Sequence, residues 1–135
     1  MFNFKNILIV SIGGILGTLS RYFVYLSAEY FALTNFPIAV LFINSIGSFF
    51  IGFLFAMFNS LEIYKTYKLF CFVGFLGAFT TFSAYSLDTI NLFFENKFKL
   101  GFLNILLNNI LSLVFVVLGF WLAKILYIFF TKNSV

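Results

Sequence analysis

Long apolar runs separated by short polar segments dominate the chain, and each run is as long as a membrane-crossing helix. A hydrocarbon core of about 30 Å requires roughly 20 predominantly apolar residues in a helix. Four stretches meet that requirement, at about residues 7–26, 37–58, 69–94 and 102–124. The apolar character of the fourth stretch continues to Phe130. We therefore predict an all-α membrane protein with four transmembrane helices in one domain over residues 1–135.

Composition narrows the class of protein further. Hydrophobic residues make up 63% of the 135 residues and charged residues 9%, whereas a soluble domain is about half apolar and about a quarter charged. The eight Lys and Arg residues are scattered, which argues against a nucleic-acid surface. Histidine is absent, so an enzyme would lack the commonest catalytic base. We expect the first apolar segment to be retained as a helix rather than removed as a signal peptide.

The distribution of positive charge bears on topology. Four spans put both chain ends on one side of the membrane, and the Lys and Arg bias of short loops orients such proteins. The side of the termini carries Lys5, Lys65, Lys68, Lys124 and Lys132, and the other side carries Arg21, Lys97 and Lys99. Termini inside is the better single orientation, but so small a bias also suits insertion in both directions and an antiparallel homodimer. Because four helices fill their own centre, transport would require oligomerisation.

Two small-residue motifs predict close helix contacts. Gly13-x-x-x-Gly17 lies in the first span, and Ser48-x-x-x-Gly52 lies in the second. Small residues spaced by four let the backbones of two membrane helices approach closely. We interpret both motifs as packing surfaces.

Several polar side chains lie within the spans, where lipid offers them no partner. Arg21 can extend its charge to the interface, or it can supply a fixed positive charge at the mouth of an anion path. Asn44 can join helices by hydrogen bonds, or it can replace the hydration of a passing ion. Asp88 requires a partner, a proton or a position at the interface. These alternatives remain open at this point.

A polar stripe marks one face of the fourth span. Asn104, Asn108 and Ser112 recur every four residues, and Asn109 lies beside them. Such a stripe faces protein or water rather than lipid, so it indicates a pathway more strongly than one polar residue does. The ring of Phe82, in the third span, offers an electropositive edge that a small anion can contact.

The stretch "GFLGAFTTFSAYS", which begins at Gly74, concentrates glycine and hydroxyl residues inside the third span. Gly74 and Gly77 weaken a helix, and the hydroxyls of Thr80, Thr81 and Ser83 can pair with backbone groups that a break releases. Released carbonyls suit a hard cation such as Na⁺, whereas the N–H groups of a restarting helix suit an anion. A continuous helix packed through small residues is the alternative.

Three segments, in order and at matching spacing, resemble the Fluc family of fluoride channels, also called CrcB. They are "GGILGTLSRY" (13–22), "NSIGSFFIG" (44–52) and "GFLGAFTTFSAY" (74–85). The third is the most specific, because it is close to the family pattern Gly-x-x-Thr-Thr-Phe-Ser-x-Phe. The resemblance covers essentially the whole chain.

The resemblance implies a fluoride-selective channel that exports cytoplasmic fluoride passively, as a dual-topology antiparallel dimer in the bacterial inner membrane. It implies a third helix broken at mid-membrane and a structural Na⁺ on the two-fold axis, held by the main-chain carbonyls of Gly77 and Thr80. Arg21 would lie at the pore entrance. Together with the amide stripe, the resemblance predicts a fluoride pathway along Asn44, Thr81, Phe82, Ser83, Tyr85, Asn104 and Asn108.

Three positions depart from the family pattern. Tyr85 replaces the second phenylalanine, Ala84 replaces a serine or threonine, and Ala78 replaces a glycine. The first two departures leave a second hypothesis, in which the chain is a half-pore subunit of a heterodimer with a related chain. A third hypothesis, a small proton-coupled exchanger, would have to use Asp88 as its membrane-embedded carboxylate.

Overall fold

The computed structural model describes residues 3–31, 36–61 and 64–132, and its secondary structure there is helical. The elements in chain order are α1 (Phe4–Phe31), α2 (Ile38–Ser60), α3 (Lys65–Lys68), the π-helix η1 (Leu69–Leu76), α4 (Gly77–Phe79), α5 (Phe82–Phe94) and α6 (Phe98–Lys132). Four segments are long and apolar enough to cross a membrane: Phe4–Ala28, Ile38–Ser60, Lys65–Phe94 and Phe98–Lys132. The prediction of an all-α protein with four such helices is confirmed.

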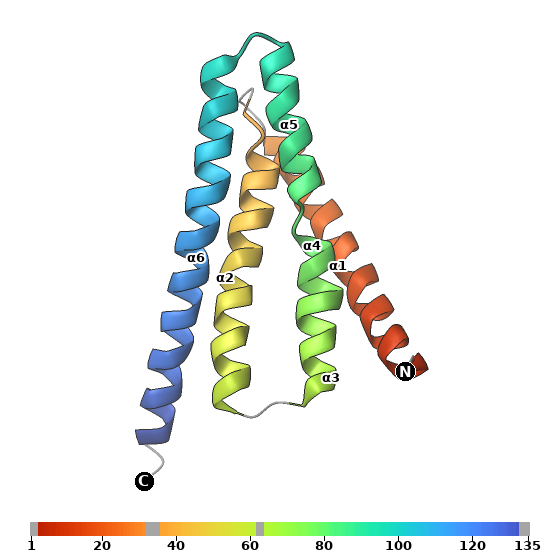
Figure 1. The fold of residues 1–135 in the computed structure, drawn as a ribbon, viewed down its shortest axis with the longest axis vertical. Coiled ribbons are helices and arrows are strands. Elements are labelled where there is room, and N and C mark those ends of the chain that lie inside the picture. Colours follow the sequence, from red (N-terminus) through yellow and green to blue (C-terminus); the bar gives the residue numbers. More distant parts are fainter. Residues whose placement is uncertain (1–2, 32–35, 62–63, 133–135) are drawn as a thin grey trace.

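The helices form two packed pairs (Figure 1). α2 lies beside α6, and α1 packs along η1 and α4. The start of α1 and the end of α6 lie at the same end of the molecule. The fourth helix extends further than the predicted end at residue 124, because the apolar run that follows stays helical to Lys132. With 35 residues α6 is about 52 Å long at about 1.5 Å per residue.

Glycines set the distance between the paired helices. A Cβ added at Gly17 of α1 would collide with the carbonyl oxygen of Phe75 in η1. A Cβ at Gly52 of α2 would collide with the carbonyl oxygen of Val116 in α6. Backbone therefore lies directly against backbone at both crossings, as the two small-residue motifs predicted for their glycines.

Gly74 serves the same purpose from the opposite helix. An added Cβ would lie 3.0 Å from the Cα atom of Gly13 and 2.9 Å from the carbonyl oxygen of Val10. The predicted role of Gly74 was to weaken the third helix, yet this residue lies inside the π-helix η1. Its missing side chain is needed for the contact with α1.

The interior is small and partly polar. The largest fully buried side chains are Val40, Ile43, Leu76 and Asn104. Large apolar side chains on all four long segments are exposed in the single chain, as expected for helices that face lipid rather than water. Asn104 is a polar member of this core, with 0% of its surface exposed.

Replacing Gly17 by alanine should destabilise the protein by about 1–3 kcal/mol, because the added methyl group meets backbone atoms that cannot move aside. Thermal unfolding of the purified protein in detergent micelles measures the change. Gly14→Ala is the matched control, since an added Cβ there has nothing within 4 Å. Equal unfolding temperatures for the two variants would contradict the assigned contact.

Candidate functional site

Two residues with extended backbone join α4 to α5. α4 ends at Phe79, and Thr80 follows with φ −77° and ψ 154°. Thr81 has φ −150° and ψ 117°, and α5 then begins at Phe82. The hydroxyl oxygen of Thr81 accepts a hydrogen bond from the N–H of Ala84 at 3.2 Å, so Thr81 is the N-cap of α5. We call these two residues the Thr80–Thr81 link.

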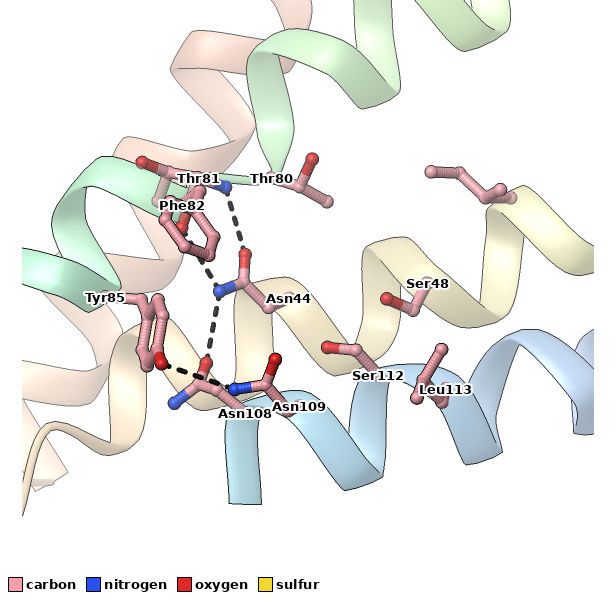
Figure 2. A pocket seen from close by; sticks show the side chains of 11 residues that line it. Asn44, Ser48, Thr80, Thr81, Phe82, Tyr85, Asn108, Asn109, Ser112 and Leu113 are labelled. Atoms are coloured by element: carbon pink, nitrogen blue, oxygen red, sulfur yellow. Dashed lines mark hydrogen bonds between the residues drawn. The ribbon is translucent and has the colours of Figure 1, made fainter. Parts of the chain in front are cut away.

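Asn44 of α2 pairs with the backbone of Thr81 in both directions (Figure 2). The N–H of Thr81 donates to Oδ1 of Asn44 at 2.9 Å, and Nδ2 of Asn44 donates to the carbonyl oxygen of Thr81 at 3.2 Å. The second Nδ2 proton goes to Oδ1 of Asn108 at 3.1 Å. Both protons of the Asn44 amide are thus used within the protein, and of the two open interpretations the geometry favours the hydrogen-bonded joint between helices.

Behind Asn44 the hydrogen bonds continue through a chain of side chains. Nδ2 of Asn108 donates to Oδ1 of Asn104 at 2.8 Å, and Nδ2 of Asn104 donates to the hydroxyl oxygen of Thr89 at 2.9 Å. The Thr89 hydroxyl in turn donates to the carbonyl oxygen of Tyr85 at 2.8 Å. We call these residues the amide chain. It ties α2, α6 and α5 together below the surface.

A cavity of about 320 Å³ lies in front of the amide chain. Its polar lining includes Asn44, Ser48, Thr80, Thr81, Asn108, Asn109 and Ser112. The rings of Phe82 and Tyr85 also line it, with centroids 5.1 Å apart and planes inclined by 67°. We call this space the amide cavity. It brings together residues from α2, the link, α5 and α6, as Figure 2 shows.

Two residues that line the amide cavity were not predicted as part of the site from the sequence. Ser48 was interpreted as part of a packing motif, yet it lines the amide cavity one turn beyond Asn44. Asn109 was noted only as a neighbour of the stripe, yet its Nδ2 donates to the Tyr85 hydroxyl at 3.3 Å. The spacing of four residues between Asn44 and Ser48 was the available signal, because it places both side chains on one helix face.

Asn104 differs from the other stripe residues. Its side chain is fully buried and supports Asn108 from behind rather than lining the amide cavity. Ser112, at the other end of the stripe, does line it. A four-residue repeat places side chains on one face of a helix, but the position of the neighbouring helices decides which of them border open space.

Arg21 and Ser83 lie at a different cavity, of about 410 Å³. It is also lined by Tyr25, Ala84 and Thr81, and we call it the arginine cavity. The hydroxyl oxygens of Ser83 and Thr81 are 3.2 Å apart. Thr81 is the residue that borders both cavities. The structure therefore divides the predicted pathway residues between two spaces that meet at the link.

The carbonyls of Gly77 and Thr80 lose their usual helical partners at the link. In a continuous helix the N–H of Thr81 would donate to Gly77, but it donates to Asn44 instead. The N–H of Ala84 would likewise donate to Thr80, but it donates to the hydroxyl of Thr81. The two predicted cation ligands are thus released from helical pairing.

Asp88 stands apart from both cavities. It borders a third space, of about 540 Å³, together with Tyr25 of α1 and Pro37 before α2. The rest of that lining is largely apolar. The carboxylate of Asp88 therefore does not face the Thr80–Thr81 link.

Asn44→Asp should destabilise the protein by about 2 kcal/mol or more. A carboxylate still accepts from the Thr81 N–H, but it cannot donate to the Thr81 carbonyl or to Asn108, which leaves buried acceptors unpaired. Thermal unfolding in detergent micelles measures the loss, with Asn91→Asp, at an exposed position of α5, as the control. The assigned pairing is wrong if both variants unfold at the wild-type temperature.

Taken together, fold and site define a multi-pass membrane protein with small polar cavities at a link between two helix segments. The chain belongs to the CrcB family, since the family model described as "CrcB-like protein, Camphor Resistance (CrcB)" matches residues 8–120. The resemblance inferred from the three sequence segments is confirmed.

Similar proteins carry the name fluoride-specific ion channel FluC. The relative from Ruminiclostridium cellulolyticum is 44% identical over 120 residues, which cover 88% of this chain and 92% of the relative. The one from Campylobacter fetus is 38% identical over 126 residues, covering 93% and 98%. The one from Pyrococcus abyssi is 37% identical over 123 residues, covering 90% and 98%. These names describe channels rather than enzymes.

Proposed function

We propose that this protein is a fluoride-selective ion channel that lets cytoplasmic fluoride leave the cell passively and so lowers its toxicity. The observation that carries the proposal is the amide cavity, in a chain of the CrcB family whose relatives are named fluoride-specific channels. The described residues that line the cavity include hydroxyl and amide groups, and none of them is Asp or Glu. Such a lining accepts a small anion without charge repulsion.

The two rings of the amide cavity suit the same ion. The edge of an aromatic ring carries partial positive charge, so a ring edge can contact an anion without holding it tightly. Phe82 and Tyr85 stand at a steep angle to each other, which points the edge of one ring toward the face of the other. A pathway with weak contacts of this kind allows an ion both to enter and to leave.

We propose further that two copies of the chain form a dual-topology antiparallel dimer in the bacterial inner membrane, with the link at mid-membrane. The ring of Phe82 is 74% exposed in the single chain, beside a polar cavity that one chain leaves open to its surroundings. A second copy laid across the link would cover both. The nearly even distribution of Lys and Arg on the two sides supports insertion in both orientations.

A structural Na⁺ at the centre of that dimer is part of the proposal. The carbonyl oxygens of Gly77 and Thr80 fit a hard cation, because their helical N–H partners bond elsewhere. Gly77 lies on the exposed surface of the single chain, where the same residue of a second copy could approach it. The ion would supply a fixed positive charge between the two links.

The half-pore subunit of a heterodimer is the second candidate. Ala84 lines the arginine cavity and Tyr85 lines the amide cavity, so each of the two departures from the family pattern changes one cavity. A related chain with a serine or threonine and a phenylalanine at these positions would complement them. The proton-coupled exchanger gains no such support, because Asp88 borders the third space and not the cavities at the link.

Liposomes that contain this chain alone should release fluoride and retain chloride, as followed with ion-selective electrodes after the membrane potential is clamped. Release should not require a pH gradient, and Asp88→Asn should leave it unchanged. Release that appears only after a related chain is added would favour the heterodimer. Dependence on a pH gradient and on Asp88 would favour the exchanger.

Phe82→Ile should slow fluoride release about tenfold, the effect of roughly 1.4 kcal/mol on a barrier, because a branched alkyl group has no electropositive edge. Phe94→Ile is the matched control, since that ring is 80% exposed at the end of α5. Circular dichroism in micelles checks that both variants fold. Equal release by both would remove Phe82 from the pathway.

A further inference from the structure

Tyr85 carries a polar group into the wall of the amide cavity. The residue is 8% exposed, and its side chain lines the cavity beside Phe82. A buried hydroxyl offers one donated proton and can accept hydrogen bonds from others. Buried donors are normally paired, so the partner of the Tyr85 proton has to be identified.

The contact with Asn109 shows whether the Tyr85 hydroxyl acts there as a donor or as an acceptor. Nδ2 of Asn109 donates to the carbonyl oxygen of Ile105 at 2.7 Å and to the oxygen of Tyr85 at 3.3 Å. A backbone carbonyl can only accept, so the bond to Ile105 determines that the amide nitrogen, and not its oxygen, lies on this side. The oxygen of Tyr85 is therefore an acceptor here, and its proton must point elsewhere.

Within the part of the chain that the structure describes, the Tyr85 proton has no acceptor. The amide oxygens of Asn44 and Asn108 accept from the Thr81 N–H and from Asn44, and neither accepts the Tyr85 proton. The amide protons of Asn44 are used as well. The Tyr85 hydroxyl is thus an available donor in the wall of the amide cavity, beside the ring of Phe82.

We propose that the Tyr85 hydroxyl donates a hydrogen bond to the anion in the amide cavity. Asn109 orients the hydroxyl for this bond. The inference rests on the proposed function, because fluoride is the anion concerned, and it adds a ligand that the ring edge alone does not supply. A hydrogen bond to an ion is shorter and stronger than one between neutral groups. Fluoride gains more from it than chloride, since the smaller ion brings its charge closer to the donor.

Tyr85 would then contribute a contact to the ion that a phenylalanine at the same position cannot make. A phenylalanine at position 85, as in the family pattern, would present only a ring edge to the ion. The hydroxyl of Tyr85 adds a directed donor, and Asn109 occupies the opposite side of the same oxygen. Asn109 is in this sense a positioning residue, whereas Tyr85 touches the ion.

Near-ultraviolet difference spectra of the full-length protein in micelles test the inference, with sodium fluoride titrated against sodium chloride. A tyrosine that donates to an anion changes its absorbance, so the wild type should give a saturable fluoride-specific signal that Tyr85→Phe abolishes. Tyr67→Phe, at an exposed position of α3, should keep it. Asn109→Leu should keep the signal but shift its midpoint to a higher fluoride concentration.

Fluoride release from liposomes supplies the second readout. Tyr85→Phe should raise the half-saturating fluoride concentration about tenfold or more, the usual effect of losing a hydrogen bond to a charged group. A fluoride signal that survives in Tyr85→Phe, or a wild type that shows none, overturns the inference. An unchanged midpoint in Asn109→Leu overturns the orienting role.

The two readouts separate this inference from the channel itself. Wild-type protein that releases fluoride without a Tyr85-dependent signal would contradict the hydroxyl ligand and leave the channel standing. A Tyr85-dependent signal in protein that releases no fluoride would contradict the channel and support the binding site.

Discussion

The pairing of backbone groups at Thr81 is the constraint on which the rest of the site depends. A peptide group that leaves a helix within a membrane must find another partner, because lipid supplies none. One amide side chain meets this demand here, since Asn44 accepts from the Thr81 N–H and donates to its carbonyl. The extended link can exist because a residue on a different helix takes the place of the missing helical turn.

Close packing of α2 on α6 allows that arrangement. Asparagine is a short side chain, so Asn44 reaches Asn108 at 3.1 Å only if the two backbones lie near each other. Gly52 and Gly119 provide the approach, each lying against a carbonyl oxygen of the facing helix. Glycines two or more turns from Asn44 and Asn108 thus determine whether the hydrogen bond between these two residues can form.

The sequence was sufficient to predict the four long helices and several residues of the candidate site. It did not tell which of those residues border a cavity and which are buried behind it. Run length alone identifies an apolar helix, and a spacing of four identifies a shared face. Neither tells which residues of that face border a cavity, and Asn104, expected in the pathway, is buried behind the amide cavity. The length that a membrane requires did not define where the helix ends, and α6 continues beyond the predicted span to Lys132.

The sequence also did not tell which glycines and threonines of the third span form the break and which pack against a neighbouring helix. Gly74 was interpreted through its effect on its own helix, but it is needed for the contact with α1. The extended residues are Thr80 and Thr81. The Thr81 hydroxyl accepts from Ala84 and the Thr81 N–H donates to Asn44, whereas the Thr80 hydroxyl donates to the carbonyl oxygen of Leu76. Such partners come from the three-dimensional arrangement and leave no periodic mark in the sequence.

The hydrogen bonds of the amide chain share one direction, and this couples the orientations of its side chains. One series of hydrogen bonds runs in a single direction, from the N–H of Thr81 through the amides of Asn44, Asn108 and Asn104 to the hydroxyl of Thr89. A backbone N–H can never become an acceptor, so no single amide in the row can turn over without breaking contact with both neighbours. The row therefore behaves as one oriented unit with aligned dipoles that reinforce one another. Losing the hydrogen bond between Asn104 and Thr89 would therefore weaken the orientation of the whole row, including the amide of Asn44 that pairs with Thr81.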